Sequence, residues 1–90
     1  MKLFYNDLVW SRYRSDFLYI NMLQLGKYKH YKGNEYEVLS IATYSETLEP
    51  MVVYQALYGN NEIWVQSLKR FTEEVEVDGE NIPRFKYLGE

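Results

Sequence analysis

The sequence contains no cysteine and one histidine, which together restrict the chemistry that this 90-residue chain can support. Without cysteine, neither a disulfide nor a thiolate metal site can reinforce the fold. A lone histidine, His30, cannot form a metal centre by itself, and no carboxylate stands at a spacing that would clearly complete one. We therefore expect His30 to be structural, and we expect no metal site, no cofactor and no catalytic residue.

Long hydrophobic runs are also missing. No uninterrupted apolar run exceeds four residues, as at 17–20 and 51–54. A membrane-spanning helix needs about 20 apolar residues. A secretory signal needs an apolar region of about 7–15 residues. We therefore expect a cytoplasmic protein that does not enter a membrane, and the lack of cysteine agrees with that location.

Positive charge is scarce after residue 34. Six basic and two acidic residues give residues 1–34 a balance of +4, whereas four basic and eleven acidic residues give residues 35–90 a balance of −7. An acidic body is a poor nucleic-acid binder, because phosphate contacts supply most of that affinity. The basic stretch 27–32 is the one place that such a partner could touch. We interpret it as a solvated strand edge, where lysine also prevents aggregation.

Aromatic residues are abundant, with ten tyrosines, four phenylalanines and two tryptophans, and the strongest local pattern lies among them. Two runs of strand-forming residues flank Gly59–Asn61, which indicates a hairpin. A turn centred on Asn60 and Asn61 predicts three apolar cross-strand pairs, Tyr58 with Ile63, Leu57 with Trp64, and Ala56 with Val65. Because these pairs alternate between faces, we expect both faces to be covered in the middle of a small closed sheet.

The residues before this hairpin also read as strands. Residues 27–31 alternate loosely and indicate an edge strand, followed by a turn at 32–34. Residues 35–44 form the longest predicted strand, and Pro50 marks the beginning of the next one. The predicted strand would place five residues on one face, namely Tyr36, Val38, Ser40, Ala42 and Tyr44.

After the hairpin, residues 67–71 are suited to a single helical turn. Residues 74–77 alternate, and Asp78-Gly79 is a type I′ turn signal that sets Val75 opposite Ile82. Five or six short antiparallel strands with tight turns predict a mainly β fold, a small barrel or roll. A short helical turn before the last strands is typical of SH3-type barrels.

The first 21 residues differ from the rest. Trp10, Tyr13, Phe17 and Ile20 follow one another at helical spacing, and Asn6 or Asp7 could cap a helix. In one interpretation this helix packs over an open end of the sheet. In the other, residues 1–21 are an N-terminal extension and residues 22–90 are the domain.

Six ordered motifs between residues 27 and 85 resemble a bacterial family known as domain-of-unknown-function family 1653. They are Y-K-H-Y-K-G, Y-E-V-L, S-E-T-L-E, V-V-Y-Q-A-L-Y-G, I-W-V and V-D-G…I-P-R-F. The resemblance implies a single SH3-type barrel and no activity. The family pattern has histidine before S-E-T and Arg-Pro after W-V, whereas this sequence has Tyr44 and Gln66-Ser67. The resemblance begins near Gly26, which favours the interpretation of residues 1–21 as an extension.

A binding surface is the function that the composition favours. Tyrosine and tryptophan combine a large contact area with a polar group, which suits recognition. We predict a non-enzymatic binding module with an aromatic and polar groove for a peptide, a protein or a small ligand. The predicted groove residues are Tyr44, Ser45, Glu46, Thr47, Tyr54, Trp64 and Arg84.

Each predicted groove residue has a plainer interpretation. Residues 45–47 could form a turn in which hydroxyls bond nearby backbone, which we favour. Trp64 could be a core residue, which we also favour because its predicted partner is apolar. Two other functions stay open. One is a small enzyme with Glu46 as base and Arg84 holding an anionic substrate, and the other is an assembly domain that self-associates.

Overall fold

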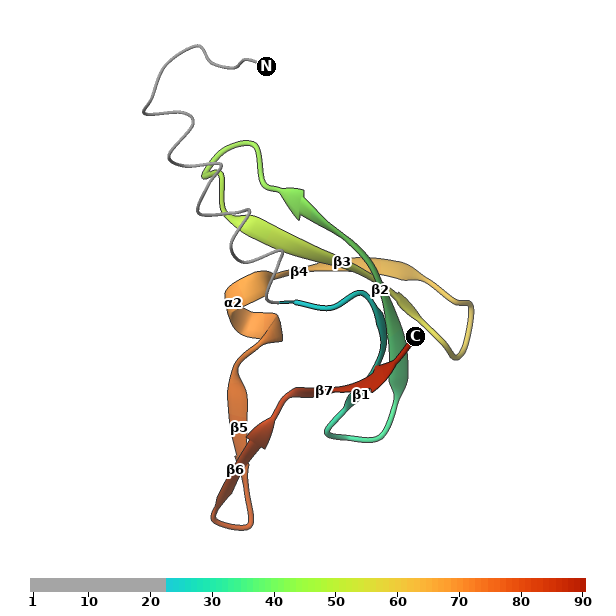
Figure 1. The fold of residues 1–90 in the computed structure, drawn as a ribbon, viewed down its shortest axis with the longest axis vertical. Helices are drawn as coiled ribbons and strands as arrows, with labels where there is room; N and C mark the ends of the chain where they lie inside the picture. The colour runs from blue at the N-terminus through green and yellow to red at the C-terminus, as the bar shows by residue number, and fades with distance from the viewer. Residues whose placement is uncertain (1–22) are drawn as a thin grey trace.

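The computed structural model describes residues 23–90, which form seven strands and one short helix (Figure 1). The strands make two antiparallel sheets, one in the order β4-β3-β2-β1-β7 and one of β5 and β6. The predicted N-terminal helix and domain boundary lie outside the described residues. The elements are β1 (Gly26–His30), β2 (Glu35–Thr43), β3 (Pro50–Ala56), β4 (Ile63–Ser67), α2 (Leu68–Phe71), β5 (Glu74–Val77), β6 (Glu80–Pro83) and β7 (Phe85–Gly89).

The prediction of a mainly β fold is confirmed, but the predicted closed barrel is wrong. Within residues 23–90, β4 and β7 are the outer strands of the five-stranded sheet, and they do not pair with each other. β1, predicted as an edge strand, lies between β2 and β7. β7 pairs with the outer side of β1, so β7 occupies the sheet edge that the sequence pattern assigned to residues 27–31.

The hairpin predicted at the centre of the sequence forms with a different register. Tyr54 lies opposite Trp64, so all three predicted pairs are wrong. Residues 57–62 connect the strands, in place of a two-residue turn. The connection is closed by the N–H of Ala56, which donates to the carbonyl of Glu62 at 2.9 Å, and it turns where the N–H of Asn61 donates to the carbonyl of Tyr58 at 3.0 Å.

A β-bulge interrupts β2 and reverses which residues face the core. The β2–β3 ladder shifts between Val38 and Ser40, with Leu39 as the extra residue. Before the bulge, Tyr36 and Val38 are buried; beyond it, Ile41 packs against the core. The predicted face therefore holds only in its first half, and it fails for Ser40, Ala42 and Tyr44.

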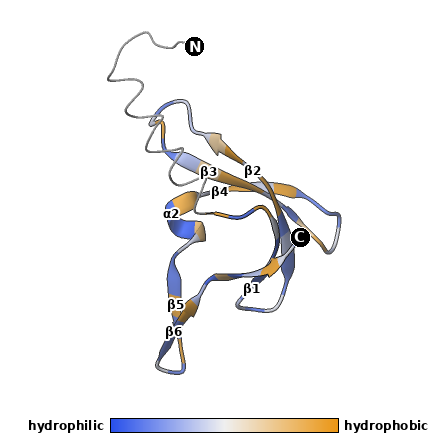
Figure 2. Ribbon diagram, viewed as in Figure 1, coloured by the Kyte–Doolittle hydropathy of each residue, from blue (hydrophilic) through white to orange (hydrophobic). Residues whose placement is uncertain are grey.

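The core lies between the concave face of the larger sheet and α2, and five of its nine buried residues are aromatic. The rings of Phe71 and Phe85 stack at 4.0 Å between centroids and 4° between planes. The hydroxyl of Ser67 caps α2 by accepting from the N–H of Arg70 at 3.2 Å, as the predicted helical turn requires. Figure 2 shows both apolar and polar residues within this turn. No helix within residues 23–90 is long and apolar enough to cross a membrane.

The β5–β6 hairpin extends away from the larger sheet (Figure 1). Its predicted turn and register are confirmed: Asp78 and Gly79 both have positive φ, at 53° and 82°, and Val75 lies opposite Ile82. The backbone of Arg84 fixes the base of the hairpin. Its N–H donates to the carbonyl of Glu73, and its carbonyl accepts from the N–H of Tyr31.

Candidate functional site

Four of the predicted groove residues lie in the exposed loop between β2 and β3. The loop closes on itself, because the N–H of Tyr44 donates to the carbonyl of Glu49 at 2.9 Å and the N–H of Leu48 donates to the carbonyl of Tyr44 at 2.7 Å. The Thr47 hydroxyl accepts from the N–H of Glu49 at 3.2 Å. This hydrogen bond agrees with the turn interpretation of residues 45–47.

Tyr54 was predicted to line the groove and Trp64 was expected to fill the core, and the structure places each residue the other way round. Tyr54 is 5% exposed and its ring packs edge-on against Phe71 and Phe85, so it is a core residue and cannot line a groove. Trp64 is 41% exposed, so the expectation that it fills the core is wrong. Its indole N–H donates to Glu62 at 3.2 Å on the surface. The altered register explains the exchange, because Trp64 pairs with Tyr54 and not with Leu57.

Arg84 lies at the junction of β6 and β7, a part of the chain that is well apart from the β2–β3 loop (Figure 1). Its guanidinium is 3.4 Å from the carboxylate of Glu73. Its Nε is buried and has no hydrogen-bond partner within residues 23–90. The structure therefore does not bring Arg84 together with Tyr44, Glu46 or Thr47 in one groove, and the pair proposed for an enzyme, Glu46 and Arg84, is not assembled.

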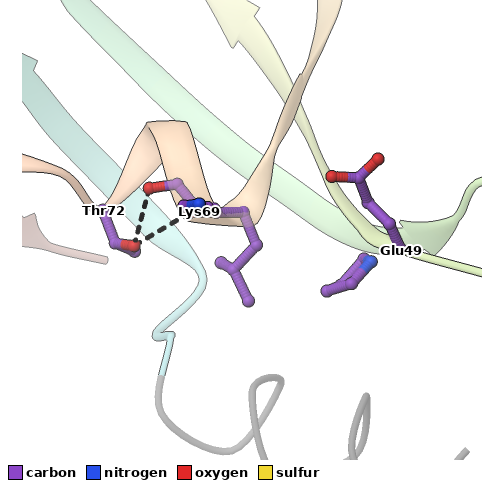
Figure 3. Close-up of a pocket in the computed structure, with 5 residues that line it drawn as sticks. Glu49, Lys69 and Thr72 are labelled. Atoms are coloured by element: carbon purple, nitrogen blue, oxygen red, sulfur yellow. Dashed lines mark hydrogen bonds between the residues drawn. The ribbon is translucent and has the colours of Figure 1, made fainter. Parts of the chain in front are cut away.

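One pocket of about 340 Å³ lies between α2 and the start of β3 (Figure 3). Glu49 stands on one side of it and Lys69 on the other, with Leu68 and Pro50 supplying apolar surface. The Thr72 hydroxyl is already engaged, donating to the carbonyls of Leu68 at 2.9 Å and Lys69 at 3.3 Å. One acid and one base leave this pocket without a preference for ligand charge.

A second pocket, of about 420 Å³, has a clear charge preference. We call it the basic pocket, and it lies where the end of β1 meets the bend between β6 and β7. No acidic residue lines it within the described part of the chain. Its lining residues are Lys29, His30, Tyr31, Ile82, Pro83 and Lys86.

The two lysines of the basic pocket lie directly opposite each other. Lys29 of β1 pairs with Lys86 of β7 in the ladder, an arrangement of like charges that destabilises a sheet. Glu35 lies opposite Lys29 on the β2 side and offsets part of this repulsion. Lys32 does not line the pocket, but its ammonium group lies 5.8 Å from the ring centroid of Tyr31, which does. An anion bound here would relieve the remaining repulsion.

His30 also lines the basic pocket. Its Nδ1 accepts from the N–H of Lys32 at 3.1 Å, which leaves the proton of the neutral ring on Nε2. Burial, then the nearby positive charges of Arg84 and Lys32, lower the pKa of His30. The ring packs edge-on against Phe85 at 4.9 Å, which agrees with the structural role predicted for it. No group of three potential metal ligands occurs within residues 23–90.

Sequence reasoning identified half of the basic pocket and missed the other half. The stretch 27–32 stood out by its charge, but Ile82, Pro83 and Lys86 lie some fifty residues later. Only the pairing of β1 with β7 brings them together, and no local pattern predicts that pairing. The only local signal for the second half was weak: Lys86 follows Phe85 in a predicted strand that comes after Pro83.

Comparison with known proteins gives the chain a family. Residues 26–87 match the family described as "Protein of unknown function (DUF1653)". The chain belongs to the DUF1653 family. A crystal structure of a DUF1653 protein from Bordetella bronchiseptica is 35% identical to this member and has a TM-score of 0.72. The match covers 78% of this chain and 92% of that one. No curated protein matches this DUF1653 member. All six lining residues of the basic pocket fall within the matched segment.

Proposed function

We propose that this DUF1653 member is a non-enzymatic binding module that holds the anionic group of a small ligand or a peptide in the basic pocket. The observation that carries the proposal is the opposed pair Lys29 and Lys86 in a pocket with no acidic lining residue. Lysine is a compact point charge that suits carboxylate or phosphate without demanding one geometry. The volume of about 420 Å³ falls within the range of small-molecule sites.

The remaining lining residues extend this recognition. Ile82 and Pro83 offer apolar surface for the body of a ligand, and Tyr31, 37% exposed, offers an aromatic face. His30 lines the pocket with a neutral ring whose proton lies on Nε2. This combination of a few polar groups with apolar walls is typical of sites that fix the orientation of a ligand. It favours an organic anion with an apolar or aromatic body over a free inorganic ion.

The same geometry gives less support to an enzyme. Within residues 23–90, no carboxylate contacts His30 to orient it as a general base, and its Nδ1 is occupied by the N–H of Lys32. A nucleic-acid partner is disfavoured by the net charge of −3. We also place the protein in the cytoplasm of a bacterium, which the bacterial source of the similar structure and the absence of cysteine support.

The experiment is a titration of the full chain with benzoate, followed by the amide NMR signals of His30 and Tyr31. Benzyl alcohol has the same ring without the charge and serves as the ligand control. We expect benzoate to shift these signals, and we expect its affinity to fall as sodium chloride is added. Equal binding of benzyl alcohol, or shifts confined to other residues, would contradict the proposal.

A pair of charge-reversal variants locates the site. Lys86→Glu should weaken benzoate binding by at least about fivefold, because it replaces a favourable exposed charge with a repulsive one. Lys69→Glu makes the same change on α2, in the other pocket, and should leave the affinity unchanged. A greater loss for Lys69→Glu than for Lys86→Glu would move the anion site to α2.

A further inference from the structure

The outer edge of β4 is the least protected surface of the sheet. No strand within residues 23–90 pairs with it. Ile63 is 58% exposed and Val65 is 61% exposed, the two largest exposed fractions among the bulky apolar residues of the described chain. Trp64, between them, is 41% exposed on the opposite face. An apolar edge of this kind is a template for pairing with another strand.

The backbone of the same residues is available for hydrogen bonding. In an antiparallel ladder, residues bonded to the neighbouring strand alternate with residues whose N–H and C=O point to the other side. Because Ala56 donates to the carbonyl of Glu62, the bonded positions of β4 are those in phase with Glu62, including Trp64. Ile63 and Val65 therefore direct their backbone groups away from β3.

The other edge of the sheet contrasts with this one. β7 carries Lys86, and its ladder with β1 is irregular beside Lys27. A charged residue and a distorted ladder are the features with which proteins protect an edge. β4 has the sequence I-W-V-Q-S, with no charge and no proline. Unlike β7, β4 therefore presents an unprotected apolar edge within residues 23–90.

We propose that β4 pairs antiparallel with β4 of a second copy of this chain, about a two-fold axis at Trp64. In this register Ile63 of each copy lies opposite Val65 of the other, and the two Trp64 residues face each other. The strand is thus complementary to itself, as a two-fold interface requires. In the same register Glu62 of each copy lies opposite Gln66 of the other, so no like charges are paired along the new ladder.

The first test is the mass of the full chain in solution by sedimentation equilibrium, from low to high micromolar concentration. We expect the mass to rise from 10.9 kDa toward twice that value. The concentration range extends high because a single pair of strands forms a small interface of modest affinity. A mass that stays at 10.9 kDa throughout would overturn the proposal.

Two lysine variants place the interface on β4. Val65→Lys adds a charge at a position already 61% exposed, so the chain should fold as before, as its circular dichroism would show. It should remain monomeric wherever the unchanged chain is dimeric. Leu88→Lys makes the same change on β7, at a position 47% exposed, and should leave the dimer intact. Loss of the dimer in Leu88→Lys alone would assign the interface to β7 and refute the proposal.

Single cysteines test the register, since the chain has no cysteine of its own. The two Trp64 residues would form a non-hydrogen-bonded pair with Cα atoms about 4.5 Å apart, within disulfide range. The two Val65 residues would be diagonal neighbours, about 7–8 Å apart and at the limit of that range. Mild oxidation should therefore crosslink Trp64→Cys faster than Val65→Cys. The opposite order contradicts the register.

A dimer that forms only after removal of residues 1–22 would show that this segment occupies the edge instead, and would also overturn the proposal.

Discussion

Truncation of Phe71 should remove a large part of the stability of the fold. Its side chain is 1% exposed, stacks on Phe85 at 4.0 Å, and meets Tyr28 and Tyr54 edge-on at 5.4 and 5.5 Å. A buried aromatic ring withdraws on the order of 150–250 Å² from water, which at about 25 cal/mol per Å² gives an upper estimate of ~4–6 kcal/mol. We expect Phe71→Ala to lower the free energy of unfolding by about 3–5 kcal/mol.

Trp64→Ala is the matched comparison, because the sequence pattern assigned the central core position to that ring. Trp64 is 41% exposed, and its ring centroid lies 6.2 Å from that of Tyr54 and 6.1 Å from that of Tyr36. We expect a loss of about 1–2 kcal/mol, less than for a buried ring because much of the side chain is already in water.

Both free energies come from urea denaturation followed by far-ultraviolet circular dichroism, since tryptophan fluorescence would change with the substitution itself. The measurements are made at low micromolar concentration, where self-association contributes least. A small domain has a total stability near the lower end of about 5–15 kcal/mol, so Phe71→Ala should leave a visible unfolded fraction. If Trp64→Ala costs more than Phe71→Ala, the assignment of the core is refuted.

Two further predictions concern alkaline pH and the N-terminal segment. Burial, then the hydrogen bond between the hydroxyls of Tyr36 and Tyr58, raises the pKa of Tyr36 to about 12 from a usual value of 10.0, so the folded chain holds this proton more tightly than the unfolded chain. The resulting stabilisation is complete below pH 10 and is lost as the pH rises toward 12. In urea titrations Tyr36→Phe should lose less stability over this range, and an equal loss in both proteins would contradict the assignment. A chain that begins at Met22 should still fold, because the described residues bury a core of nine side chains between Tyr28 and Phe85. Melting curves should show a loss of about 1–4 kcal/mol, with increased light scattering. An unfolded short chain would place residues 1–21 in the core, and identical behaviour of the two chains would exclude any docking of that segment.

The features that could be predicted from the sequence are those decided within a few neighbouring residues. Asp78-Gly79 adopts the positive φ angles of its turn without help from distant residues. The hydroxyl of Ser67 caps α2 by accepting from the N–H of Arg70, three residues later, and Pro50 begins β3. The Thr47 hydroxyl likewise bonds two residues away. Each of these is a local hydrogen bond or a steric preference, so the types of a few neighbouring residues are enough to predict it.

Most of the features that were missed depend on segments far apart in the chain. The hairpin register, by contrast, is a local feature, and it was missed because the connection of residues 57–62 is longer than a two-residue turn. The bulge at Leu39 lies in the pairing of β2 with β3, and it shifted half of a strand to the other face. The same limitation applies to the candidate site. Lys29 was visible as part of a basic stretch, but Lys86 joins it only through the pairing of β7 with β1. Alternation within one strand cannot reveal which other strand will lie beside it.

The strand order of the larger sheet has a consequence for affinity. The basic pocket lies at the β7 edge, and the free strand β4 lies at the other edge, so the two surfaces are separated by the width of the sheet. Two copies joined through β4 would carry their pockets at opposite ends of one continuous sheet. A target that presents two anionic groups at that separation would meet the second pocket at a high effective concentration. A module with a weak single site would then bind a repeated or dimeric target through avidity, and would release isolated anions readily.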